Sequence, residues 1–194
     1  YGTRGLADRV SGRIEPDMTA LCLDETPLES GLIELSTEGA GRLAVCPARA
    51  PFERLARAKA VDAAERFEER VAEATRHVEF VLVDVPPVAT NPAVAAVSAA
   101  ETVAIVADED RAAAAVPRTR DRLADVGVES SLTVVTRADA HPDADVAVPS
   151  IDGAAPQSDD STGNDALAEL VEATTGVTIE REAESQLLEH VPFR

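Results

Sequence analysis

An aspartate at the end of a strongly apolar run is the best candidate for chemistry in this chain. In "FVLVDVPP", residues 80–83 are apolar, Asp84 follows them, and Pro86 and Pro87 come shortly afterwards. The run predicts a buried strand, and the prolines prevent that strand from continuing. A carboxylate at the carboxyl end of a strand can orient a magnesium-bound or nucleophilic water beside nucleotide phosphates. Asp84 is therefore the candidate catalytic residue and, through water, the candidate Mg²⁺ ligand.

The elements around Asp84 are expected to alternate between strands and helices. Apolar runs predict strands at 78–84, 102–107 and 132–135, with a shorter one at 145–150. Helical patterns predict helices at 52–77, 92–99, 110–125, 165–174 and 182–190. Continuous apolar strands that alternate with helices are typical of a parallel sheet covered on both faces. The expected fold is α/β, a three-layer, mostly parallel, doubly wound sheet.

Local signals refine these elements. Asn91 and Pro92 fit an N-cap and the first helical position, and Pro117 is expected to kink or restart its helix. "RLAVCPA" predicts a short buried strand that ends at Pro47, whereas "MTALCLDE" fits a strand or a helical turn. A polar loop is expected at 153–165, and a flexible tail at 191–194.

In a doubly wound sheet, ligands bind beyond the carboxyl ends of the strands. Asp84, Asp108 and the pair Thr136–Arg137 occupy such positions in the predicted elements. An ordinary polar loop explains Asp108 adequately. A polar loop explains Asp84 less well, because an apolar run followed by an aspartate and two prolines is a more specific pattern than a polar residue after a strand.

Several segments resemble the ParA/MinD family of P-loop ATPases. "FVLVDVPP" resembles the family's Walker B and switch II region, and "AAETVAIVADED" resembles the next strand. "DRLADVGVESSLTVVTRAD" is similar to the segment with an Asn-Arg pair at the adenine, and "DVAVPS" to a later strand near the base. The likeness covers roughly residues 41–174 and implies a P-loop NTPase-like fold.

The resemblance implies ATP and Mg²⁺ as cofactors and assigns roles to individual residues. Asp84 would organise the magnesium and the water. Switch II would be shaped by Pro86 and Pro87, and the base pocket would be lined by Thr136, Arg137 and Pro149. Members of the family dimerise with ATP and reverse that state by hydrolysis, positioning plasmids, chromosomes or division machinery. A homodimer and a protein partner or regulator are therefore expected.

The sequence also departs from the family pattern. The Gly-rich phosphate loop with its lysine is missing, and Lys59, the only lysine, lies in a predicted helix. The resemblance places that loop before Tyr1, so residues 1–194 are expected to form a single α/β domain without its phosphate-loop part. Thr136 replaces the adenine-contacting Asn, and Val88 replaces a common Gly.

Two functions follow. The first is an ATP-dependent dimerising switch protein used to position DNA or division machinery. In this case the chain is not expected to be catalytic alone, and it is part of an ATPase only if an upstream phosphate loop exists. The alternative is a non-catalytic relative that no longer binds nucleotide and acts through protein–protein interaction. A receiver-like domain matches less well, because it would need a lysine after a late strand.

The composition restricts the partners. The chain has 18 basic and 36 acidic residues, a net charge of −18, so contact with bare nucleic acid through a basic face is not expected. Scarce lysine with abundant Asp, Glu, Ala and Val is typical of an extreme halophile, although a GC-rich genome also favours arginine over lysine. Cys22 and Cys46 lie in apolar surroundings typical of buried, reduced thiols. Without a membrane segment or a signal peptide, a cytoplasmic protein is expected.

Overall fold

The computed structural model describes residues 7, 10–24, 26–37, 41–151 and 161–179. These belong to two compact units: unit 1 comprises Tyr1–Glu101 and Thr119–Glu129, and unit 2 comprises Thr102–Arg118 and Ser130–Arg194. The helix expected at 182–190 and the tail at 191–194 lie outside the described residues, as does most of the loop expected at 153–165.

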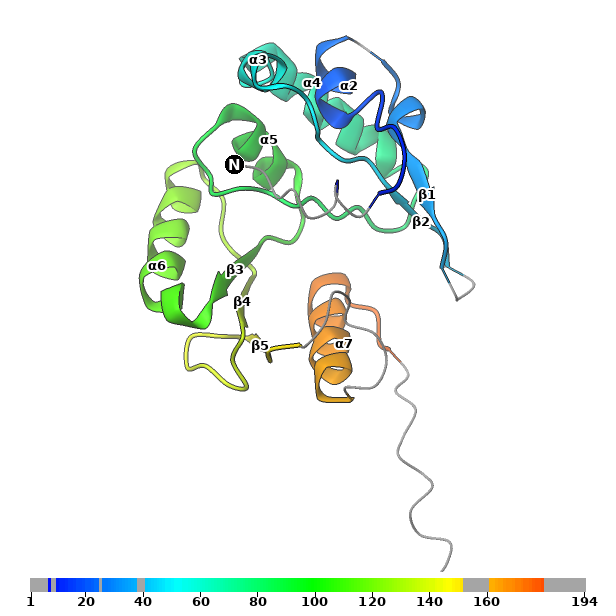
Figure 1. Ribbon diagram of the computed structural model, residues 1–194. Helices are drawn as coiled ribbons and strands as arrows, with labels where there is room; N and C mark the ends of the chain where they lie inside the picture. The colour runs from blue at the N-terminus through cyan, green and yellow to red at the C-terminus, as the bar shows by residue number, and fades with distance from the viewer. Residues whose placement is uncertain (1–6, 8–9, 25, 38–40, 152–160, 180–194) are drawn as a thin grey trace, which may run out of the picture. The chain divides into compact units, whose positions relative to one another are not determined.

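Unit 2 contains a parallel sheet. Its strands are β3 (Ala104–Asp108), β4 (Leu132–Thr136) and β5 (Val146–Val148), in the order β3-β4-β5. The helix α6 (Glu109–Asp125) connects β3 to β4, and α7 (Ser161–Thr175) follows β5 (Figure 1). The predicted α/β class with parallel strands and flanking helices is therefore confirmed, in a sheet of three strands among the described residues.

Alternating side chains of the strands build the core of unit 2. One face of the sheet carries a buried apolar cluster, against which Ile151 and two leucines of α7 pack. The cluster consists of Leu132, Val134, Val146 and Val148, and the α7 residues are Leu167 and Leu170. Each such side chain contributes about 1.5–3 kcal/mol when it leaves water. The opposite face is also buried along β4, at Thr133 and Val135, which explains why this strand is apolar almost throughout.

The helix α6 runs without interruption through Pro117, so the expected restart there is wrong. Its buried residues Ala112 and Val116 are four positions apart and therefore share one face of the helix. The exposed residues Arg111 and Arg118 are charged, as expected for an amphipathic helix.

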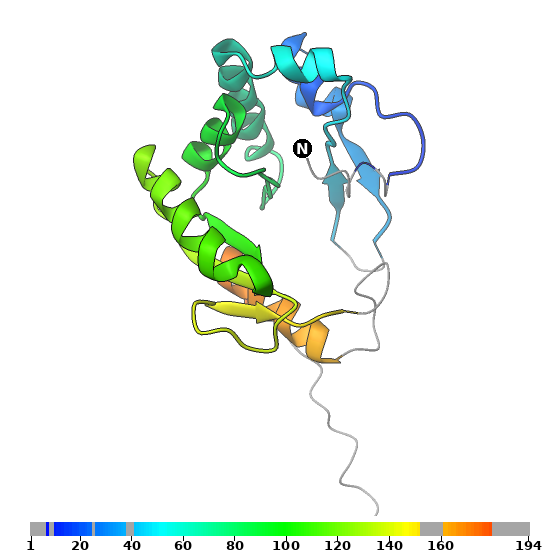
Figure 2. The same cartoon turned by 60° about the vertical axis from the view of Figure 1, so that its left-hand side comes forward.

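Unit 1 is mainly helical and also contains a small antiparallel strand pair. The pair is formed by β1 (Ile33–Leu35) and β2 (Leu43–Val45), with Ile33 opposite Val45. Among the described residues of the unit the longest helix is α4 (Val61–Ala74), which contacts both α2 (Met18–Leu23) and α5 (Asn91–Ala99) (Figure 2). In chain order the elements are α2 (Met18–Leu23), η1 (Leu28–Gly31), β1 (Ile33–Leu35), β2 (Leu43–Val45), α3 (Phe52–Arg57), α4 (Val61–Ala74) and α5 (Asn91–Ala99).

Local capping explains why α2 is a helix, one of the two forms that its sequence fitted. Asp17 is the N-cap, and its Oδ1 accepts a hydrogen bond from the Ala20 N–H at 2.9 Å. Its Oδ2 accepts a second bond from the Arg49 N–H at 2.6 Å, which ties the start of α2 to the chain after β2. In contrast, β2 is not the buried strand expected from "RLAVCPA", because Leu43 is half exposed in a pair of strands.

The single helix expected at 52–77 is two helices, α3 and α4, separated by a turn at 58–60. The side-chain amide of Asn91 donates to the Lys59 carbonyl oxygen at 2.9 Å in this turn. This bond satisfies a carbonyl group at the helix break. It also shows why Asn91 is not the predicted N-cap: α5 begins at Asn91 itself, and Thr90 occupies the N-cap position.

The strand predicted at 78–84 is wrong. Residues 78–90 are in neither a strand nor a helix, and apolar side chains of this segment are exposed, with Leu82 at 83% and Phe80 at 45%. A strand needs a neighbour for its main-chain groups, and no described residue forms a strand ladder with this segment.

Candidate functional site at the carboxyl edge of the parallel sheet

The carboxyl ends of β3 and β4 place Asp108 and Thr136 side by side. They are the last residues of their strands and partners in the parallel register. The Thr136 hydroxyl donates to Asp108 Oδ1 at 2.9 Å, and it also lies 3.4 Å from the Ala107 carbonyl oxygen. Both side chains are partly buried, so the strand backbones hold this pair in a defined position.

Arg137 completes the cluster from the first position after β4. Its Nη2 lies 3.3 Å from Asp108 Oδ1 and 3.4 Å from Oδ2, while its side chain remains 69% exposed. The backbone of Arg137 has φ = 61°, in the left-handed region that residues other than glycine rarely adopt. Such a conformation costs roughly 1–3 kcal/mol and persists where surrounding contacts impose it.

The end of β5 lies at the same edge of the sheet. Thr136 is the register partner of Val148, and the Ala138 N–H donates to the Val148 carbonyl oxygen at 3.2 Å. Pro149 follows directly, so the loop after β4 and the loop after β5 start together. The structure therefore brings together three of the sequence-predicted site residues: Thr136, Arg137 and Pro149.

The charges at this edge favour an uncharged polar group of a ligand over an anionic phosphate group. Arg137 already pairs with Asp108, and the first turn of α6 carries Glu109 and Asp110 where a bare helix N-terminus would attract anions. The exposed guanidinium can donate hydrogen bonds, and the Thr136 hydroxyl can accept them. This set can form hydrogen bonds with ring nitrogen, carbonyl or amino groups.

Asp108 is the site residue that the sequence-based assignment left out. Its position at the end of an apolar run was visible, but many loop residues share that position. Only the strand register shows that Asp108 faces Thr136 and bonds to both members of the Thr136–Arg137 pair.

Asp84, Pro86 and Pro87 belong to unit 1, and all three are exposed. The strand that was expected to present Asp84 is not formed, so Asp84 does not lie at the end of a strand. The role of Asp84 stays a prediction.

The residues described do not by themselves fit a resident magnesium ion. Asp84 offers one exposed carboxylate, and the described part of the chain contains no group of three or more His, Cys, Asp or Glu placed to hold a metal. Magnesium demands octahedral oxygen ligands, so further ligands would have to come from phosphates and water.

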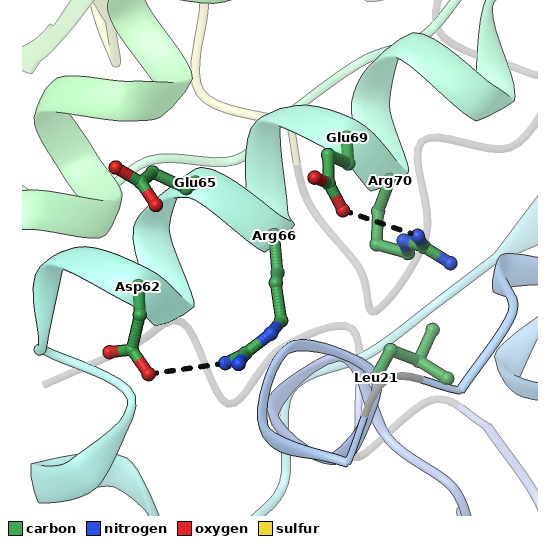
Figure 3. Close-up of a pocket in the computed structure, with 6 residues that line it drawn as sticks. All are labelled: Leu21, Asp62, Glu65, Arg66, Glu69 and Arg70. Carbon is green, nitrogen blue, oxygen red and sulfur yellow. Dashed lines mark hydrogen bonds and ion pairs between the residues drawn. The ribbon is translucent and has the colours of Figure 1, made fainter.

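A separate pocket of about 360 Å³ lies on α4, beside α2 (Figure 3). Its six lining residues are Leu21, Asp62, Glu65, Arg66, Glu69 and Arg70. Both arginines are engaged in structural contacts: Arg66 Nη1 bonds to Asp62 and to the Cys22 carbonyl oxygen, and Arg70 Nη1 bonds to Glu73 and to the Thr26 carbonyl oxygen. These contacts fasten α4 to α2 and to the chain that follows α2.

None of the sequence-predicted site residues lines this pocket. Its charged residues lie within the helix predicted at 52–77, and none of them was assigned a role in a site from the sequence. More carboxylates than guanidinium groups surround it, which makes it a poor phosphate site.

The fold and the carboxyl-edge cluster define an α/β protein with a small parallel sheet and a polar site at its carboxyl edge. Comparison of the chain with protein families, with curated proteins and with solved structures found no match. Among the residues that the structure describes, no helix is long and apolar enough to cross a membrane.

Proposed function

We propose that this chain is a nucleotide-responsive α/β domain of the ParA/MinD type, part of an ATP-dependent dimerising switch used to position DNA or division machinery. The observation that carries the proposal is the cluster of Thr136 and Arg137 with Asp108 at the carboxyl edge of the parallel sheet, where Pro149 also lies. In α/β sheets this edge is where ligands bind.

In this proposal the cluster contacts the base of an adenine nucleotide. The Thr136 hydroxyl proton is engaged by Asp108, so its oxygen accepts from an amino group, while the Arg137 guanidinium donates to ring nitrogens. Pro149 covers the edge of the base. Asp84 and the Pro86–Pro87 pair keep their proposed roles in water positioning and in switch II.

We expect binding without hydrolysis from this chain alone. The 194 residues contain no Gly-rich turn with a lysine, and such a turn supplies the backbone amides and the cation that grip the phosphates. The affinity should therefore be modest and come mainly from the base.

Equilibrium titration of a fluorescent ATP analogue tests the proposal, with Mg²⁺ and molar KCl because the composition is halophile-like. We expect saturable binding that Arg137→Ala weakens at least about fivefold, or about 1 kcal/mol for a lost polar contact. Arg118→Ala is the matched control, because Arg118 is an exposed arginine of unit 2 outside the site. Absence of saturable binding, or equal effects of the two variants, contradicts the proposal.

The second candidate is a domain that does not bind nucleotide and acts through protein–protein interaction. The exposed apolar residues of segment 78–83 favour it, because exposed apolar runs commonly mark interaction sites. The same titration separates the two candidates, since this one predicts no saturable binding of the nucleotide.

A further inference from the structure

The main chain of residues 79–89 is unpaired among the residues that the structure describes. The Val78 N–H closes the end of α4 by donating to the Ala74 carbonyl oxygen at 3.1 Å. Beyond it, no hydrogen bond joins residues 79–89 to the part of the chain that the structure describes, and none of these residues belongs to a strand or helix. Their N–H and C=O groups are therefore available to another main chain.

This segment also exposes several apolar side chains: residues 80–83 form an apolar run in which Val81 is partly buried, and Val78 lies before it, beyond Glu79. Leu82 is 83% exposed, Val78 46%, Phe80 45% and Val83 38%. A single exposed apolar side chain is ordinary, whereas a contiguous group is typical of interaction surfaces. Valine, phenylalanine and leucine side chains also pack well on a pleated surface. The run therefore combines free main-chain groups with side chains suited to a strand.

The charges at its two ends indicate what can pair with it. Glu79 and Asp84 flank the apolar run, both are exposed, and the whole chain carries a net charge of −18. In the register that centres residues 80–83 on a two-fold axis, an antiparallel pairing of two copies would place Glu79 of one copy opposite Asp84 of the other, twice. Like charges directly opposite each other destabilise a strand pair. A second copy is therefore a poor occupant, and a basic-flanked strand is a good one.

We propose that residues 80–85 form a docking edge for an extended segment of a partner protein, with apolar residues flanked by arginine or lysine. The two main chains pair as strands, and the flanking cations lie beside Glu79 and Asp84. Main-chain hydrogen bonds supply the affinity in this mode of binding, and side chains supply the selectivity. The inference goes beyond nucleotide binding and does not depend on it.

Three capped, fluorescently labelled peptides test this docking edge by anisotropy. The first is Arg-Val-Ile-Val-Ile-Arg, the second replaces both arginines with glutamate, and the third is the first with alternate peptide nitrogens methylated. In about 0.15 M KCl we expect saturable binding of the first, and at least about tenfold weaker binding of the other two. In about 1 M KCl the difference in affinity between the arginine and glutamate peptides should shrink, because salt screens the charges. The methylated peptide should still bind more weakly than the first.

Two variants of the full chain locate the binding. Leu82→Asp should weaken binding of the first peptide at least about tenfold, whereas Phe52→Asp should leave it unchanged. Leu82 and Phe52 are both 83% exposed in unit 1, so neither change disturbs a buried core, and circular dichroism verifies the fold of each.

Several results would overturn the proposal. They are no saturable binding of the arginine peptide, equal binding of the methylated peptide, or equal losses in the two variants. Sedimentation equilibrium provides the last check: self-association abolished by Leu82→Asp would identify a second copy as the occupant. None of these measurements contains nucleotide, so their failure is distinct from failure of the proposed function.

Discussion

The Thr136 hydroxyl donates a 2.9 Å hydrogen bond to Asp108 Oδ1, joining the last residues of two neighbouring parallel strands. The same carboxylate pairs with Arg137, so one side chain holds both polar groups at the edge of the sheet. Asp108 is thus the residue on which the geometry of the site depends.

Replacing Asp108 with alanine should destabilise the protein by about 1–2 kcal/mol. The lost hydrogen bond accounts for about 1 kcal/mol, and the exposed ion pair for between 0 and about 1 kcal/mol. Urea unfolding in high salt, followed by circular dichroism, measures the change. Asp139→Ala is the control, because Asp139 is an exposed aspartate beyond the same strand and should have little effect. Equal destabilisation by the two changes would contradict a special role for Asp108.

The left-handed backbone of Arg137 leads to a comparison between two substitutions. Arg137→Ala and Arg137→Gly both remove the guanidinium, but only alanine must place a Cβ at φ = 61°. We expect the glycine variant to be more stable than the alanine variant by about 1 kcal/mol. Thermal and urea unfolding of the pair measure this difference. An alanine variant at least as stable as the glycine variant would show that the strain is absent.

The strands of unit 2 could be predicted from sequence, because each apolar run has a partner strand within the chain. Residues 80–83 have the same apolar character, yet they form no strand. Pairing is a non-local property, so composition alone cannot reveal whether a neighbour exists. The break between α3 and α4 is non-local as well, since Asn91 bonds to the distant Lys59 carbonyl group.

The candidate site was predictable in part. Thr136 and Arg137 were found because strand ends are visible in sequence and parallel strands end at one edge, whereas Pro149 was assigned through the resemblance to the ParA/MinD family. The contribution of Asp108 follows from the register, which a single sequence does not specify. The conformation of Arg137 was also hidden, because arginine carries no local preference for positive φ.

Arg70 should be the more important of the two arginines in the pocket of Figure 3. Its side chain is 17% exposed, as is that of Glu73, with which it pairs at 2.9 Å, whereas the Asp62 partner of Arg66 is 66% exposed. Arg70→Met should therefore lower the free energy of unfolding by about 2–3 kcal/mol, because a largely buried carboxylate and a carbonyl oxygen lose their arginine partner. Arg66→Met should cost about 1 kcal/mol.

Urea unfolding compares these two variants, and a double-mutant cycle with Glu73→Gln tests the assigned partner. Coupling between Arg70→Met and Glu73→Gln of about 1 kcal/mol or more is expected for residues in contact. A larger cost for Arg66→Met than for Arg70→Met would contradict the ranking by burial.

The two cysteines should make stability fall at alkaline pH. Burial raises the pKa of the Cys22 thiol to about 11 and that of Cys46 to about 12, from an ordinary value of 9.0. Above pH 9 the unfolded chain loses thiol protons that the folded chain retains, so rising pH favours unfolding until the folded pKa values are passed. For Cys22, 5% exposed, the slope approaches about 1.4 kcal/mol per pH unit.

Urea unfolding at about pH 8 and pH 10 measures this slope. The Cys22→Ala/Cys46→Ala double variant is the reference, because it retains every other titrating group. It should lose less stability between the two pH values than the parent. Iodoacetamide at about pH 8 should also modify the thiols slowly in the folded protein and rapidly in urea. Equal pH slopes of parent and double variant would rule out the thiols as the cause.

Gly31 is placed where no larger residue fits, and Gly41 provides its matched control. A Cβ on Gly31 would lie 2.8 Å from Leu21 Cδ1 and 3.1 Å from Cys46 Sγ, whereas a Cβ on Gly41 would meet nothing within 4 Å. Leu21 is fully buried and cannot move aside freely. Gly31→Ala should therefore cost about 1–3 kcal/mol through overpacking. Gly41→Ala should be neutral or stabilise by up to about 1 kcal/mol, because it restricts the unfolded chain. Urea unfolding of both variants decides the point, and equal stabilities would show that the packing around Gly31 is looser than these distances require.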